Sequence, residues 1–177
     1  MRHLHKIKRV PFIVWYSKHE LTHILLGLVY AWFLRELWNQ FSWHYLWLSI
    51  FGSLVIDADH LAYAFTYGRH DIYSVEVRRI LKQGQIGTLF KFWRDNHKHN
   101  TGLATHNMYI LGFCLILGLI SLFFDWKVRT VLFGAIVLHL LFDIIDDLWV
   151  LGRVNDNWKH LRHKKTTQDY STHQASH

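Results

Sequence analysis

The sequence FGSLVIDADHLAYAF, residues 51–65, places two aspartates and a histidine inside a segment that is otherwise almost entirely apolar. Moving an isolated ionised carboxylate out of water is so costly that the group normally neutralises, pairs or coordinates a metal. Asp57, Asp59 and His60 therefore need partners from elsewhere in the chain. The length of the apolar segments around them indicates the kind of fold that brings those partners together.

Long uncharged runs predict helices that cross a membrane. Residues 37–56 and 101–124 contain no Asp, Glu, Lys or Arg, which gives runs of 20 and 24 residues. A helix needs about 20 residues to cross the roughly 30 Å hydrocarbon layer. Residues 21–34 and 130–142 reach that length only if neighbouring ionisable residues are included. We therefore expect an all-α integral membrane bundle of four transmembrane helices, near residues 12–36, 43–67, 103–125 and 128–151.

A soluble helical domain with unusually apolar core helices is the alternative fold. The mean hydropathy of +0.04 is low for a membrane protein and favours this alternative. The aromatic residues favour the membrane, because the chain has 9 Trp and 8 Tyr and several lie near the ends of the expected helices. Such side chains gather at membrane–water interfaces.

The basic residues predict the orientation of the bundle. Seventeen of the 20 Lys and Arg residues lie in residues 1–18, in the connection 68–100 or after residue 151, all on one side. The positive-inside rule assigns that side to the cytoplasm. We expect a multi-pass protein of a bacterial or archaeal cytoplasmic (inner) membrane, with both termini cytoplasmic and the lipid bilayer as a partner. No nucleic-acid partner is expected, because the basic residues form no recognisable nucleic-acid module.

Ionisable side chains from four segments should meet in the cytoplasmic half of this bundle. Residues three or four apart lie on one face of a helix. That spacing pairs His19 with His23, Asp57 with His60, and His139 with Asp143, while His106 opens the third expected helix. Imidazoles and carboxylates without thiolates suit zinc, and also manganese or iron. More ligands are present than one tetrahedral ion needs, so we predict two or three ions that activate water and polarise a phosphoryl or carbonyl oxygen.

Four short motifs occur along the chain in a defined order. They are His23, then Asp57-Ala58-Asp59-His60, then Thr105-His106-Asn107, and finally His139-Leu-Leu-Phe-Asp143. Over residues 19–147 this order resembles the membrane-bound metal-dependent hydrolases called YdjM-like. That family is distantly similar to the zinc-dependent phospholipase C and P1 nuclease group, which binds zinc ions through His and Asp and cleaves phosphoesters. The resemblance implies a metal-dependent hydrolase of the phosphoesterase class, acting on a small-molecule or lipid phosphoester.

The chain departs from the family pattern at two motifs. The family usually has a proline before the first aspartate, where this chain has Ile56. The family also tends to place the two histidines of the third motif five residues apart. Here His99 and His97 precede His106 by seven and nine residues, and we favour His99 as the ligand.

Asp59 does not share a helical face with Asp57 and His60. This position predicts either an irregular backbone or a carboxylate that accepts a ring N–H from a ligating histidine. An unligated carboxylate, Asp59 or Asp147, is the candidate general base. The predicted metal ligands are His19, His23, Asp57, Asp59, His60, His99, His106, His139 and Asp143.

The sequence predicts one transmembrane domain that holds the metal site, residues 1–155, followed by a polar cytoplasmic tail. The tail, residues 156–177, is expected to be disordered. The connection 69–100 mixes apolar and basic residues, so it is expected to be an amphipathic segment in the membrane interface. Gly84 and Gly87 should break it into two short helices. An ordinary solvated connector is the alternative for this segment.

Three other functional classes use similar residues. A di-iron membrane oxidase would be expected to carry further paired histidine motifs such as His-x2-His-His, which the sequence lacks. A haem-binding bundle would not need Asp57 or Asp143. A metal transporter would need polar side chains through the outer half of the bundle, where few occur. A metal-dependent hydrolase is therefore the favoured function, although a degenerate site that binds metal only for stability would have much the same sequence.

Overall fold

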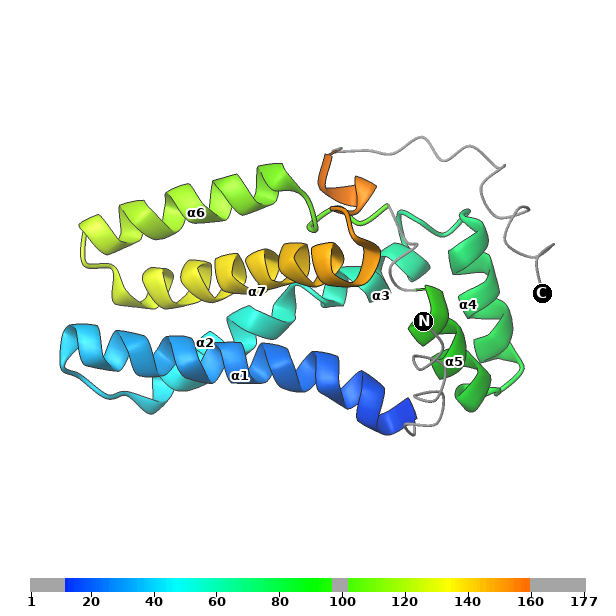
Figure 1. The fold of residues 1–177 in the computed structure, drawn as a ribbon, viewed down its shortest axis with the longest axis horizontal. Helices are drawn as coiled ribbons and strands as arrows, with labels where there is room; N and C mark the ends of the chain where they lie inside the picture. The colour runs from blue at the N-terminus through cyan, green and yellow to red at the C-terminus, as the bar shows by residue number, and fades with distance from the viewer. Residues whose placement is uncertain (1–11, 97–101, 160–177) are drawn as a thin grey trace, which may run out of the picture.

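The computed structural model describes residues 12–96 and 102–159, and the regular secondary structure within these ranges is entirely helical (Figure 1). The prediction of an all-α fold is therefore confirmed. In chain order the elements are α1 (Phe12–Trp38), α2 (Trp43–Val55), α3 (Ala58–Phe65), α4 (Ile72–Lys82), α5 (Ile86–Asn96), α6 (Met108–Phe123), α7 (Lys127–Leu151) and the 3-10 helix η3 (Asp156–Lys159).

Helices α1, α2, α6 and α7 form an elongated bundle, and the shorter helices lie at one end of it (Figure 1). Helix α7 packs against each of the other three bundle helices, and α1 also packs against α2. At the opposite end, tight turns join α1 to α2 and α6 to α7. Asn39 and Asp125 adopt left-handed backbone conformations in these turns, with φ of 47° and 55°. Such residues commonly end helices.

Two of the expected helices are shorter than predicted. The second divides into α2 and α3, because the N–H groups of Asp57 and Asp59 donate to carbonyls only three residues back, at 3.1 and 3.0 Å. This break forms without a proline. The third begins at Met108 because the Asn107 side chain caps it, accepting from two backbone N–H groups at 3.0 Å. His106 therefore precedes the helix that it was expected to open.

Two of the four predicted spans are long and apolar enough to cross a membrane. Among the described residues these are Trp43–Phe65, with 23 residues, and Lys127–Leu151, with 25. Helix α6 is apolar but has only 16 residues, about 24 Å at 1.5 Å per residue. Length and composition therefore agree weakly with a membrane protein, and the multi-pass topology stays a prediction.

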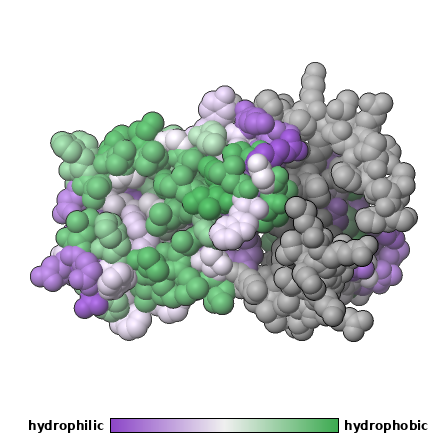
Figure 2. Space-filling view, viewed as in Figure 1, coloured by the Kyte–Doolittle hydropathy of each residue, from purple (hydrophilic) through white to green (hydrophobic). Residues whose placement is uncertain are grey.

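Large apolar side chains are exposed on all four bundle helices. Examples are Trp32, Trp43, Phe113 and Trp149, the last with 85% of its surface exposed. Figure 2 shows hydrophobic residues over much of the visible face of the bundle. Monomeric soluble proteins rarely expose contiguous apolar patches larger than a few hundred Å². A surface of this composition is typical of helices that face lipid or a partner.

Small residues allow the bundle helices to approach closely. The Ser49 hydroxyl donates to the Gly27 carbonyl at 2.7 Å, which joins α2 to α1. A Cβ at Gly27 would lie 2.9 Å from the Ile50 Cα, and a Cβ at Gly52 would lie 3.0 Å from the Ala135 Cβ on α7. Small residues at such contacts are common in membrane helix bundles. They bring the polar side chains of α1, α2 and α7 within reach of one another.

The connection between α3 and α6 contains the two predicted short helices, α4 and α5. Gly84, with φ of +66°, lies between them, whereas Gly87 lies inside α5, so only Gly84 acts as the predicted break. Val77, Ile80 and Leu89 pack with α3 in a small core. The main apolar face of α4 is therefore buried within the protein, whereas Ile72 and Val75 of the same helix are exposed. The interfacial position predicted for this segment stays untested.

The turn after α7 differs from the prediction of a disordered tail that begins at residue 156. Residues 156–159 form η3, and Asn157 and Trp158 are buried. Trp158 packs with Ile136 and Leu140 of α7. The remainder of the predicted tail lies outside the described residues.

Candidate metal centre

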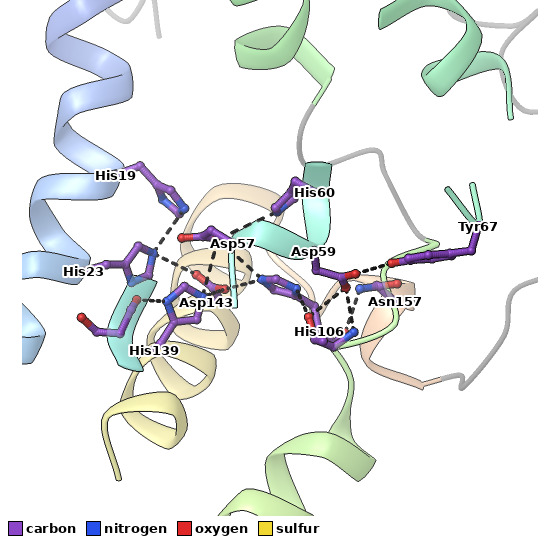
Figure 3. Close-up of polar contacts among 12 residues, drawn as sticks. His19, His23, Asp57, Asp59, His60, Tyr67, His106, His139, Asp143 and Asn157 are labelled. Carbon is purple, nitrogen blue, oxygen red and sulfur yellow. Dashed lines mark hydrogen bonds and ion pairs between the residues drawn. The ribbon is translucent and has the colours of Figure 1, made fainter. Parts of the chain in front are cut away.

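Five ionisable side chains from four separate segments meet at the end of the bundle where α3 begins (Figure 3). His139 and Asp143 lie one turn apart on α7. His23 comes from α1, Asp57 from the turn between α2 and α3, and His106 from the segment that precedes α6. His23 and His139 are completely buried, and their rings stack with centroids 3.9 Å apart.

Ring nitrogens and carboxylate oxygens of this cluster face one another. His139 Nε2 lies 3.1 Å from Asp143 Oδ2 and 3.7 Å from Asp57 Oδ1. His106 Nε2 lies 3.4 Å and 3.8 Å from the same two oxygens. His23 Nε2 lies 3.5 Å from Asp143 Oδ1. The five side chains therefore point their polar atoms toward a common volume.

Each of the five side chains has one buried polar atom with no hydrogen-bond partner within the described part of the chain. Buried polar atoms are rarely left unpaired. A divalent cation would satisfy several at once, because nitrogen and oxygen ligands bind zinc at about 2.0–2.2 Å. The unpaired atoms are His23 Nδ1, Asp57 Oδ2, His106 Nε2, His139 Nε2 and Asp143 Oδ1, and on His23 it is the other ring nitrogen, Nε2, that faces Asp143.

Three overlapping groups of residues offer ligand atoms that lie within 4.8 Å of one another. The groups share members, so two adjacent ions would have common ligands between them. The residues present therefore fit the predicted metal centre, both in their chemistry and in their proximity. The groups are His19, His23 and Asp57; His23, His139 and Asp143; and Asp57, His106 and His139.

The break between α2 and α3 orients His139. Within the break, the N–H of Asp57 donates to the carbonyl of Leu54. The neighbouring carbonyl of Ser53 lies 2.6 Å from His139 Nδ1. A carbonyl can only accept, so His139 carries a proton on Nδ1, and Nε2 is the nitrogen that it would offer to a metal. This is the form in which histidine binds a metal.

Asp59 orients His106 through Thr105. The backbone N–H and the hydroxyl of Thr105 both donate to Asp59 Oδ2, at 2.8 Å each. The hydroxyl then accepts from His106 Nδ1, 3.2 Å away, which leaves His106 Nε2 free for a ligand. The Tyr67 hydroxyl donates to the other Asp59 oxygen. Asp59 therefore accepts from Thr105 and not from a histidine ring as predicted, and it belongs to none of the three ligand groups found among the described residues.

Three other predicted site residues within the described ranges lie at or beyond the edge of the cluster. His19 Nε2 is 3.2 Å from His23 Nε2 and belongs to one ligand group. The His60 side chain is 31% exposed, with Nε2 4.0 Å from Asp57 Oδ1, and joins none of the three groups found among the described residues. Asp147 accepts from the Trp158 indole N–H at 2.8 Å and is also absent from these groups. His99, like His97, lies outside the described residues.

Several residues that support the cluster were not predicted from the sequence. Thr105 lies within a recognised motif, but nothing in its spacing shows that it bridges Asp59 and His106. Asn157 contacts the His106 segment, and Trp158 contacts Asp147. These two follow the end of α7 in a polar stretch, where the only signal is a tryptophan among polar residues. Their contacts depend on how the chain turns back after Gly152.

Comparison with known proteins identifies no relative. No protein-family model matches this chain, and neither a curated protein nor a solved structure matches it. The resemblance to YdjM-like hydrolases therefore remains a prediction that rests on the four motifs. The cluster contains at least one residue from each of these motifs.

Proposed function

We propose that this protein is a membrane-bound metal-dependent hydrolase that cleaves a phosphoester. The observation that carries the proposal is the group of five side chains that bring buried ring nitrogens and carboxylate oxygens together, several of them without a hydrogen-bond partner within the described part of the chain. This set suits two or three zinc ions, and manganese or iron are the other metals that such ligands accept. When bound, adjacent ions of this kind polarise a phosphoryl oxygen and activate water near neutral pH.

The charge of the ligands favours an anionic substrate. Asp57 and Asp143 contribute two negative charges, whereas two divalent ions contribute four positive charges, so positive charge remains when the histidines are neutral. Such an excess attracts a phosphate group more strongly than a neutral carbonyl compound. The substrate would approach from the side of Asp57 and the neighbouring His60, whose side chains are 15% and 31% exposed, because the other four residues of the cluster are more deeply buried.

We further propose that all four bundle helices lie in the bilayer, with the metal centre in the cytoplasmic half. The exposed apolar side chains of α1, α2, α6 and α7 support this arrangement. The distribution of Lys and Arg in the sequence supports the orientation. Helices α4 and α5 would then lie on the cytoplasmic side, beside the metal centre. The short helix α6 would need its flanking residues or a locally thinner bilayer to span the membrane.

The proposed metal ligands lie deep within the apolar surface of the bundle, which favours a lipid phosphoester as the substrate. On α7, exposed Ile145, Leu148 and Trp149 continue past Asp143 toward the proposed cytoplasmic side. On α3, Leu61 and Phe65 continue past Asp57 in the same way. Eight helical residues rise about 12 Å, so the ligands lie well inside the apolar surface. A substrate held in the bilayer would reach this depth without leaving the lipid.

Hydrolysis of paired substrates would test this function. The zinc-loaded protein in mixed micelles is expected to cleave a phospholipid faster than a water-soluble phosphoester with the same head group. Chelation with EDTA should stop the reaction, and added zinc should restore it. Equal rates on the two substrates would contradict the lipid assignment alone. No cleavage of a broad panel of phosphoesters by protein with a full metal complement would contradict the hydrolase assignment.

A further inference from the structure

We propose that the turn after α7 positions His106 for metal binding, an inference that rests on the metal centre proposed above. Four buried residues form this device, which we call the C-terminal latch. They are Asp147 near the end of α7, Asn155 in the following turn, and Asn157 and Trp158 in η3. None of the four belongs to the ligand groups found among the described residues, so the latch acts on the centre only through its neighbours.

The His106 segment depends on side chains for its backbone hydrogen bonds. Residues 102–107 form no helix or strand, and buried backbone groups in such a segment need other partners. Asn157 supplies two of them. Its Oδ1 accepts from the Leu103 N–H at 3.1 Å, and its Nδ2 donates to the His106 carbonyl at 2.8 Å. The second bond holds the peptide of the ligand itself.

The other latch residues hold Asn157 in place. The Asn157 N–H donates to Asn155 Oδ1 at 3.0 Å. Asp147 Oδ2 accepts from the Trp158 indole N–H at 2.8 Å and from the Asn155 N–H at 3.3 Å. Asp147 follows the ligand Asp143 by four residues on the same face of α7. One helix therefore carries both a metal ligand and the anchor of the latch.

The latch and Asp59 hold the His106 segment from two sides. Asp59 bonds to Thr105, whereas Asn157 bonds on either side of it, at Leu103 and His106. Without Asn157, the buried Leu103 N–H and His106 carbonyl would lose these partners, and the ring of His106 could shift away from the cluster. Asp147 is in this account a positioning residue, which differs from the role of general base predicted from the sequence.

A double-mutant cycle on metal affinity tests the latch. Zinc affinity would be measured by competition with a chromophoric chelator in wild-type protein, Asn157→Ala, His106→Ala and the double variant. Asn157→Ala is expected to weaken binding about 10–100-fold, as loss of a partner that orients a ligand does. In the His106→Ala background, adding Asn157→Ala should change the zinc affinity by no more than about twofold, which is the usual error of additivity. A purely structural role would weaken binding in both backgrounds.

Matched variants separate positioning from unfolding. Lys159→Ala removes an exposed side chain of the same 3-10 helix, paired with Asp156 at 2.7 Å, and should leave zinc affinity unchanged. Asp147→Asn keeps an acceptor oxygen and should keep the wild-type zinc affinity. Asp147→Ala removes that oxygen and should weaken zinc binding to the same extent as Asn157→Ala. Unchanged zinc affinity in metal-binding Asn157→Ala protein would overturn the latch alone. A wild-type protein that binds no zinc would overturn the metal centre and the latch together.

Discussion

The His139→Ala variant is expected to lose its stoichiometric metal and all hydrolysis that the wild-type protein performs. His139 belongs to two of the three ligand groups, is completely buried and lies 3.1 Å from Asp143. Its removal would leave Asp57 and Asp143 facing each other without this imidazole. We expect metal affinity to fall by more than about 100-fold, because even the loss of a residue that only orients a ligand costs up to that much. Elemental mass spectrometry of the purified variant would measure the loss.

His44→Ala is the matched control for this variant. His44 is an exposed histidine near the start of α2, at the end of the bundle where the tight turns lie. Its replacement removes the same functional group without touching the cluster and should leave metal content and hydrolysis unchanged. Wild-type metal content in folded His139→Ala protein would show that the ligand set assigned here is wrong.

Gly27→Leu is expected to disrupt both the bundle and the metal centre. A Cβ at Gly27 would lie 2.9 Å from the Ile50 Cα and 2.8 Å from the Ser53 Oγ, so the backbones of α1 and α2 must separate. Overpacking of this kind typically costs about 1–3 kcal/mol, and contact with a backbone atom places it at the upper end. His23 lies one turn before Gly27 on α1, so the same displacement moves a ligand. We expect a lower thermal unfolding temperature and loss of metal.

Gly112→Leu controls for the effect of a larger residue in a bundle helix. A Cβ at Gly112 on α6 would have no neighbouring atom within 4 Å. This variant should unfold at the wild-type temperature and keep its metal. Thermal unfolding in the same detergent, followed by circular dichroism, would compare the two variants. Equal unfolding temperatures and metal contents for Gly27→Leu and wild type would contradict the close packing of α1 on α2.

Local sequence signals predicted the main helices well. Helix α7 begins at Lys127, one residue before the predicted start, because an apolar run bounded by charges leaves little choice of position. Helix α6 begins five residues later than predicted because the Asn107 side chain caps its first turn, within a run that is uncharged from residue 101. Hydropathy does not detect a cap that depends on one side chain.

The core of the candidate site was also predictable, because buried aspartates need partners. His23, Asp57, His106, His139 and Asp143 were predicted as ligands, and the structure brings them together. Their hydrogen-bond partners were harder to foresee. Ser53 contributes only a carbonyl, and Asn157 reaches His106 through a turn whose path depends on tertiary packing. No periodic pattern marks such residues.

The metal content of wild-type protein tests the central claim most directly. The protein would be purified in mild detergent without chelators, reconstituted with zinc, manganese or iron, freed of excess metal and analysed by elemental mass spectrometry. We predict two or more equivalents of metal per chain, held through the buried His and Asp cluster. An absence of metal above background after reconstitution, in protein that circular dichroism shows to be folded and helical, would contradict the metal centre and the hydrolase function built on it.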